Sequence, residues 1–125
     1  MKKKLIEKLI SIENEIAGEK GPFLLFGLFE REDSPNMWDI VVSSPWIDKN
    51  RRKTSEYIID KINSELTPEE MITLSAVVVL YPTNDFVRDV TGEVDEVEHR
   101  SERLTNCVFN GITMKNAHII TSKNA

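Results

Sequence analysis

The stretch that most constrains the fold is residues 23–30, which read Phe-Leu-Leu-Phe-Gly-Leu-Phe-Glu. In an extended strand, alternate side chains point to opposite faces, and here both faces are apolar. Such strands lie in the middle of a sheet that is covered on both sides. Gly27 has no side chain and allows a neighbouring group to come close. A second apolar run, at residues 75–81, leads us to expect another buried central strand.

The remaining elements follow from periodicity and from capping residues. An amphipathic helix is expected over residues 3–17, and a strand over residues 38–43 that pairs antiparallel with residues 23–30. A longer helix is expected over residues 49–65, with Asp48 as its N-cap. Thr67, Pro68 and Glu70 predict a second, short helix that begins with a capping box. Thr83 or Asn84 then caps a third short helix that ends near Gly92.

The clearest local signal is Asn110-Gly111, which predicts a two-residue hairpin turn. The register that follows pairs Phe109 with Ile112, Cys107 with Met114, Thr105 with Asn116 and Arg103 with His118. Cys107, Phe109, Ile112 and Met114 then share the face that points into the core. Cys107 and His118 also share a face, but they are separated by about 13 Å, at 3.3 Å per residue. We therefore interpret Cys107 as a small core residue and not as a nucleophile paired with His118.

Together these elements predict a single α+β domain over residues 1–125. Its core is a mostly antiparallel sheet of about five strands, with helices packed on its faces. The length of 125 residues fits one domain, and one domain of this size can bury a substantial core.

Composition narrows the function classes. The chain has one cysteine and therefore no internal disulfide, and acidic residues interrupt the apolar stretch that a secretory signal would need. No stretch is long and apolar enough for a membrane-spanning helix. Because the single cysteine can form no internal disulfide, we expect a protein of the reducing cytoplasm. The formal net charge of −5 disfavours broad binding to nucleic acid, without excluding it. Phosphate-binding, dinucleotide-binding and nucleophile-elbow motifs are absent, and so is the Asp/Glu-x-Lys tripeptide of a restriction-type nuclease.

One candidate metal site lies in the acidic segment 85–103, which carries seven acidic and three basic residues. If this segment is a helix, Asp95, Glu98 and His99, together with Glu102, share one face and could bind Mg²⁺, Mn²⁺ or Zn²⁺. If it is a strand, the cluster separates. The other interpretation is an ordinary solvated charged face.

A second candidate site is a basic segment formed by Lys49, Arg51, Arg52 and Lys53. These cations occupy the first turn of an expected helix, where they oppose the helix dipole, and an anion or an acidic surface would relieve the conflict. The acidic partner could be the segment 85–103 of a second copy. Trp46 and Tyr57 flank the basic segment and could stack on a single-stranded nucleic acid.

The sequence identifies no substrate or cofactor. The leading hypothesis is a non-enzymatic binding or assembly module that self-associates, or binds a protein partner, through complementary charged patches. One alternative is a small metal-dependent hydrolase that uses Asp95, Glu98 and His99. The other alternative is an anion or single-strand binder that uses Lys49, Arg51, Arg52, Lys53 and Trp46.

Overall fold

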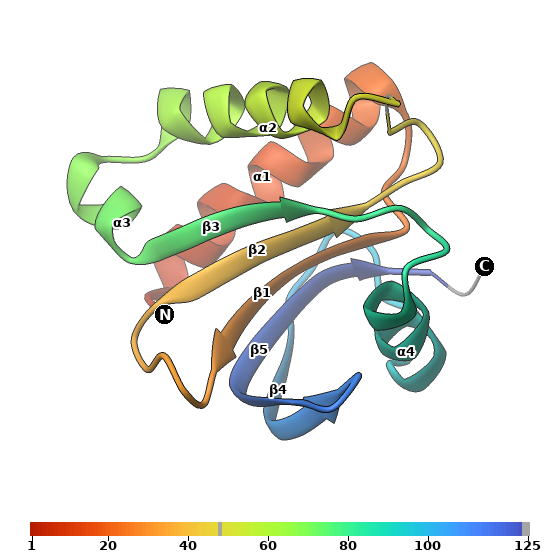
Figure 1. Ribbon diagram of the computed structural model, residues 1–125. Coiled ribbons are helices and arrows are strands. Elements are labelled where there is room, and N and C mark those ends of the chain that lie inside the picture. Colours follow the sequence, from red (N-terminus) through yellow and green to blue (C-terminus); the bar gives the residue numbers. More distant parts are fainter. Residues whose placement is uncertain (48, 124–125) are drawn as a thin grey trace.

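The computed structural model describes residues 1–47 and 49–123 and shows an α+β fold (Figure 1). The elements are α1 (Lys3–Lys20), β1 (Leu25–Arg31), β2 (Trp38–Ser43), α2 (Arg51–Glu65), α3 (Pro68–Ile72), β3 (Leu74–Val79), α4 (Asp85–Glu93), β4 (Glu102–Phe109) and β5 (Ile112–Ser122). The expected fold class is confirmed. Among the described residues, none of the helices combines the length and the apolar character that crossing a bilayer requires.

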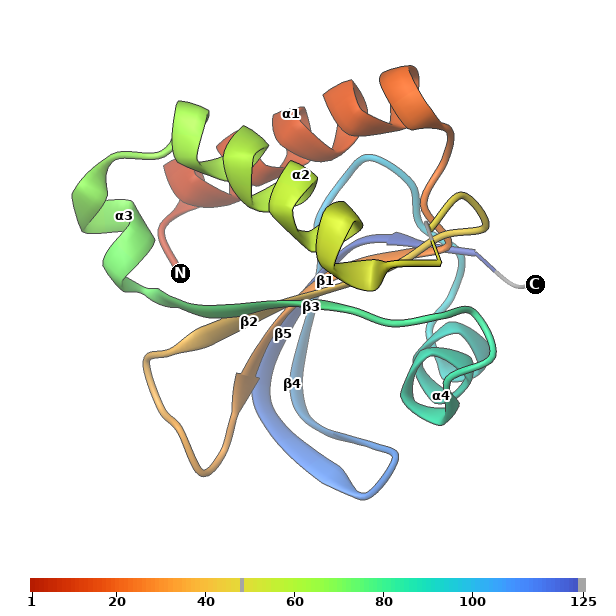
Figure 2. The same cartoon turned by 45° about the horizontal axis from the view of Figure 1, so that its top comes forward.

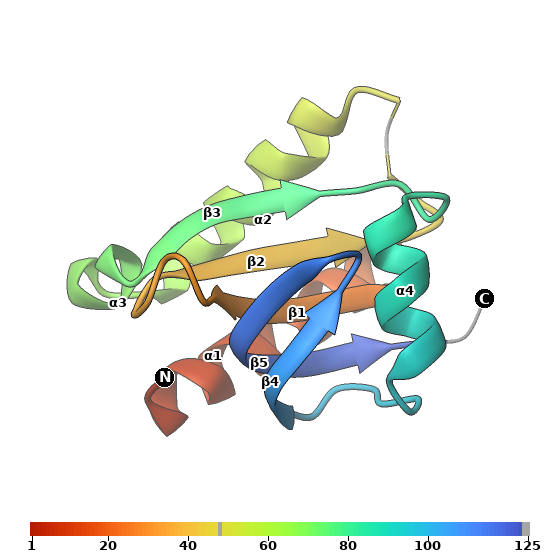
Figure 3. The same cartoon turned by 60° about the horizontal axis from the view of Figure 1, so that its bottom comes forward.

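The five strands form one sheet in the order β3-β2-β1-β5-β4. Strands β2 and β3 are parallel, and the other three neighbouring pairs are antiparallel. Helices α1 and α2 cover one face, while α4 lies on the opposite face (Figures 2 and 3). The apolar run of β1 is therefore central and buried on both faces, as its sequence predicts.

Each face of the sheet has its own hydrophobic core. The first core lies under α1 and α2 and includes Phe26, Leu28 and Ile40 from the sheet. The second lies under α4 and is centred on Phe29, Phe86 and Phe109, whose rings meet edge to face. These three aromatic residues come from β1, α4 and β4, so they hold the hairpin of β4 and β5 against α4.

Local signals predicted several boundaries correctly. Thr67 and Glu70 form the expected capping box at the start of α3, and Asn84 caps α4. The hairpin has the expected register, and Asn110 and Gly111 both have the positive φ values that a type I′ turn needs. Helix α2 begins at Arg51, with Asn50 as its N-cap. The predicted cap, Asp48, lies outside the described residues.

The prediction that residues 75–81 form a buried central strand is wrong. Strand β3 is the edge strand of the sheet, and the side chains of Ser75 and Ala76 are exposed. An uncharged apolar run is compatible with a central strand and with an uncovered edge strand. Only the order of the strands distinguishes the two.

Two bulges in β5 change which side chains share a face. Residues 115 and 120 are skipped in the pairing of β5 with β1. As a result, Cys107 packs with the core under α4, while His118 packs on Trp38 on the other face, with ring centroids 5.4 Å apart. The expectation that Cys107 and His118 share a face is therefore wrong. Ile112, expected in the core, is also exposed.

Candidate functional site

The acidic segment does not form the helix that a metal site at Asp95, Glu98 and His99 requires. Helix α4 ends at Glu93, and residues 94–101 form an irregular connection to β4. Val94 and Val97 anchor this connection because both are buried in the core under α4. Their burial leaves Asp95, Glu98 and His99 on the outer side, so the predicted shared helical face is not formed.

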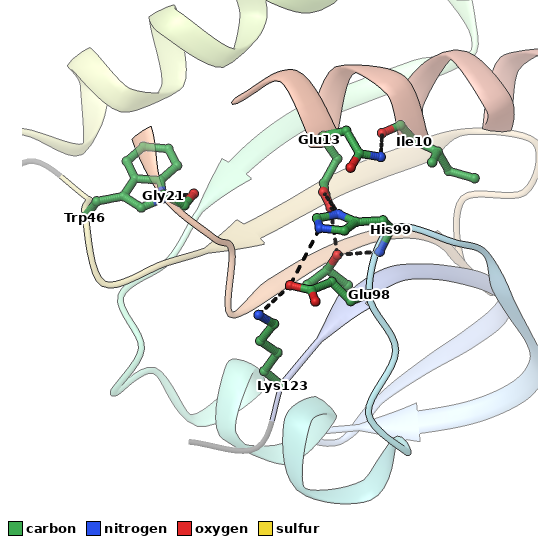
Figure 4. Close-up of polar contacts among 9 residues, drawn as sticks. Ile10, Glu13, Gly21, Trp46, Glu98, His99 and Lys123 are labelled. Carbon is green, nitrogen blue, oxygen red and sulfur yellow. Dashed lines mark hydrogen bonds and ion pairs between the residues drawn. The ribbon is translucent and has the colours of Figure 1, made fainter. Parts of the chain in front are cut away.

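His99 instead takes part in a polar network with a buried carboxylate (Figure 4). Its Nδ1 lies 2.8 Å from Oε2 of Glu13, a fully buried residue of α1. The Thr121 hydroxyl donates to Oε1 of Glu13 at 2.8 Å, and the backbone N–H of His99 donates to that hydroxyl at 3.3 Å. This network joins α1, β5 and the connection between α4 and β4. His99 adopts a left-handed conformation, with φ of 59°, to reach it.

Glu98 lies beside this network and pairs with Lys123 (Figure 4). The bond from Lys123 lowers the pKa of the Glu98 carboxyl below its usual range. His99 Nε2 is 3.6 Å from Oε2 of Glu98. In the part of the chain that the structure describes, no three His, Cys, Asp or Glu side chains are placed to hold a metal ion. The contacts of His99 and Glu98 hold the connection between α4 and β4 against α1 and the end of β5.

The basic segment is exposed at the first turn of α2, and two of its members have local partners. Arg51 donates to the carbonyl of Val79 at 3.4 Å, and its guanidinium lies 5.1 Å from the centre of the Tyr81 ring. Arg52 pairs with Glu56 one turn along the helix, with Nε and Oε1 3.2 Å apart. Cations in the first turn of a helix are repelled by the positive end of the helix dipole. These contacts offset part of that repulsion.

The two aromatic residues that flank the basic segment are engaged elsewhere. Trp46 donates from Nε1 to the carbonyl of Gly21 at 2.8 Å and packs edge to face on Phe23 (Figure 4). The Tyr57 hydroxyl bonds to Glu19. Burial and this bond raise the pKa of Tyr57 to about 12. Both rings therefore contribute to the packing of α1 and α2.

The structure reveals an open sheet edge that sequence reasoning missed. Strand β3 reads Leu-Ser-Ala-Val-Val-Val and contains neither a charged residue nor a proline. Leu80 donates its N–H to Val42 on β2, so by alternation Val77 and Val79 direct their backbone groups away from the sheet. Arg51 bonds to the outward carbonyl of Val79. Among the described residues, no loop, helix or side chain forms a hydrogen bond with the backbone N–H or C=O of Val77.

The opposite edge of the sheet, β4, is built differently. It begins with Glu102 and Arg103, both exposed, and Asn106 interrupts it with a φ of 49°. Charges and local kinks are the usual means by which proteins prevent an edge strand from pairing with another chain. Strand β4 has both features. Strand β3 carries no charge, and its pairing with β2 has one irregularity, a bulge at Ser75.

Charges of opposite sign lie at the two ends of β3. Helix α2 runs alongside β3 in the opposite direction, so its first turn lies at the end of β3 and its last turn at the beginning (Figure 1). We call Lys49, Arg51, Arg52 and Lys53 the basic end of the edge. Glu65 and Glu69, also exposed, lie where α2 leads into α3 and form the acidic end.

The buried carboxylate of Glu30 lies close to a surface groove of about 600 Å³. The groove lies between the start of α1, α3 and the turn before β2, and Asn36 and Trp38 form part of its wall. Glu30 accepts bonds from the N–H of Asn36 and from Asn116. Burial favours a higher pKa for Glu30, but these bonds bring its pKa below the usual range. Nothing in the sequence distinguishes Glu30 from the other charged residues that end strands.

Comparison with known proteins does not extend this description. No protein-family model matches the chain, and no curated protein or solved structure matches it significantly.

Proposed function

We propose that the protein is a binding and assembly module that accepts a β-strand from a protein partner at the open edge of β3. The observation that carries this proposal is the contrast between the two sheet edges. Strand β4 carries exposed charges and a kink, whereas β3 is uncharged and, beyond its bulge at Ser75, leaves the outward backbone groups of Val77 open. The outward carbonyl of Val79 is bonded to Arg51. A strand added to β3 would satisfy those groups by main-chain hydrogen bonds.

The charges around β3 support the same proposal. The basic end and the acidic end lie at opposite ends of one edge. The electrostatic potential therefore changes from positive to negative along the edge that an approaching strand would meet. Complementary charges on a partner would speed association and select one orientation of the strand. The sequence predicts complementary charged patches, and the two ends that flank β3 form such a pair. The acidic segment 85–103, proposed from sequence as the partner of the basic segment, spans α4, the connection after it and the first two residues of β4.

The other sequence-based functions have less support. The hydrolase depended on a helical arrangement of Asp95, Glu98 and His99, and helix α4 stops before these residues. The single-strand binder depended on stacking by Trp46, which packs on Phe23. A cytoplasmic location, inferred from the single cysteine, remains part of the proposal.

A synthetic peptide that copies residues 72–81 tests strand addition directly. The peptide carries a fluorescent label, and its binding is followed by fluorescence anisotropy, with a peptide of scrambled order as the control. We expect saturable binding of the native peptide that is lost in the Ser75→Lys protein, because a charge is then placed on the edge. The matched variant, Thr105→Lys on β4, is also exposed on an edge strand and should bind the peptide as the wild type does.

Two results would overturn the proposal. One is the absence of saturable binding to the wild-type protein. The other is equal binding by the wild type and by Ser75→Lys, which would place the peptide somewhere other than β3. Circular dichroism of both lysine variants establishes that each is folded, so a loss of binding reports on the edge itself.

A further inference from the structure

We infer that the partner is a second copy of this chain, joined antiparallel through β3 so that two five-stranded sheets become one. This inference rests on the proposed function and names the strand that β3 accepts. Pairing of this kind is isologous: the same surface serves on both copies, and a two-fold axis relates them. Three features of the edge fit such a pairing, and each comes from a different part of the surface.

The first feature is the direction of the backbone groups. Val77 is the outward-facing residue of β3 that lies between the bulge at Ser75 and Val79. When two copies pair antiparallel, Val77 can exchange both of its hydrogen bonds with Val77 of the second copy. Because every residue of β3 is uncharged, no like charges meet at the two-fold axis.

The second feature is the charge at the two ends. Antiparallel pairing turns one copy end for end, so the basic end of each copy lies beside the acidic end of the other. Arg52 and Lys53 then approach Glu65 and Glu69 of the second copy, twice in each dimer. Parallel pairing would bring like charges together at both ends, where they would repel each other. The charges therefore favour the antiparallel orientation.

The third feature is apolar. Among the large hydrophobic residues, Ile72 is 73% exposed, just before β3, and Tyr81 is 37% exposed, just after it. Ile72 is the last residue of α3 and lies at the beginning of the edge, and Tyr81 lies just beyond its end. Antiparallel pairing places the end of one copy that carries Ile72 beside the end of the other copy that carries Tyr81, and so covers apolar surface at both ends of the edge.

A charge-swap experiment tests this arrangement. One variant carries Lys49→Glu, Arg52→Glu and Lys53→Glu, so both ends of its edge have a net negative charge. The other carries Glu65→Lys and Glu69→Lys, so both ends are basic. Each variant alone should dimerise at least tenfold more weakly than the wild type, because like charges meet at the interface. An equimolar mixture should recover dimers that contain one copy of each variant.

Sedimentation velocity over a hundredfold range of protein concentration provides the measurement, with one variant labelled so that mixed dimers are counted. Raising the salt from about 20 mM to about 500 mM should weaken the wild-type dimer, because it screens the exposed charges. Ser75→Lys should be monomeric, and Thr105→Lys should dimerise normally.

The outcomes separate this inference from the proposed function. A wild-type protein that stays monomeric at low salt and high concentration overturns the self-pairing, while a positive peptide result would still establish strand addition. A wild-type dimer that Ser75→Lys does not disrupt overturns the use of β3. A wild-type dimer whose swapped variants do not form mixed dimers overturns the antiparallel orientation.

Discussion

Replacing His99 should reveal how strongly the Glu13 network stabilises the fold. The side chain of Glu13 is fully buried and has two side-chain partners in the network, the His99 imidazole and the Thr121 hydroxyl. A lost hydrogen bond that leaves a buried carboxyl group partly unsatisfied costs about 2 kcal/mol. Glycine adopts positive φ without a steric penalty, so His99→Gly isolates the loss of the side chain. We expect His99→Gly to lower the free energy of unfolding by that amount.

Alanine at the same position should cost more than glycine. His99 has a φ of 59°, where an alanine Cβ adds a further penalty of about 1 kcal/mol. At about 2.1 cal/mol/K of unfolding entropy per residue, each kcal/mol corresponds to a shift of about 4 °C in a chain of this length. The melting temperature should therefore fall by about 8 °C in His99→Gly and by about 12 °C in His99→Ala.

Urea unfolding followed by tryptophan fluorescence provides the measurement, since Trp38 and Trp46 both pack against the core. Glu98→Gln is the matched control: it changes an exposed ion pair in the same connection and should cost less than about 1 kcal/mol. The reasoning fails if His99→Gly stays within about 0.5 kcal/mol of the wild type. It also fails if alanine and glycine are equally stable at this position.

Three other substitutions test separate parts of the fold. Gly27→Ala should destabilise the protein by about 1 to 3 kcal/mol in chemical denaturation, because a Cβ there would meet the Phe29 ring at 2.7 Å. Ser43→Ala should raise the melting temperature, because the buried Ser43 hydroxyl has no hydrogen-bond partner among residues 1–47 and 49–123. Burial, with Arg103 nearby, lowers the pKa of His118, so the unfolded chain takes up a proton near pH 6.5 that the folded chain does not. The free energy of unfolding should therefore decrease as the pH falls below about 6.5, and less steeply in His118→Asn; an unchanged slope would contradict this.

The elements that the sequence predicts best are those whose cause is local. The turn at Asn110-Gly111 and the capping box of Thr67 and Glu70 depend on residues a few positions apart. The central position of β1 was also predictable, because both of its faces are apolar. In each case the physical cause is contained in one short stretch of chain.

The errors have a different origin, because they depend on strands that are distant in the sequence. The apolar residues of β3 are compatible with the centre of a sheet and with its edge, and only the strand order places them at the edge. The bulges of β5 are equally hidden, and they move His118 to the face opposite Cys107. Sequence reasoning identified the basic segment, but not the acidic residues near the beginning of β3, because the place of β3 at the edge depends on the strand order.

The pairing of β1 with β5 also determines when the domain can form during synthesis. Leu25 pairs with Ser122, so the central strand of the sheet receives its second neighbour only after almost every described residue has been made. Until then, the growing chain can pair β1 with β2 and β2 with β3, but one side of β1 remains without a strand. Contacts between such distant residues slow folding and leave apolar surface accessible in the meantime. We therefore expect chains that stop before β5 to aggregate and to bind chaperones, whereas the full chain folds in one late step.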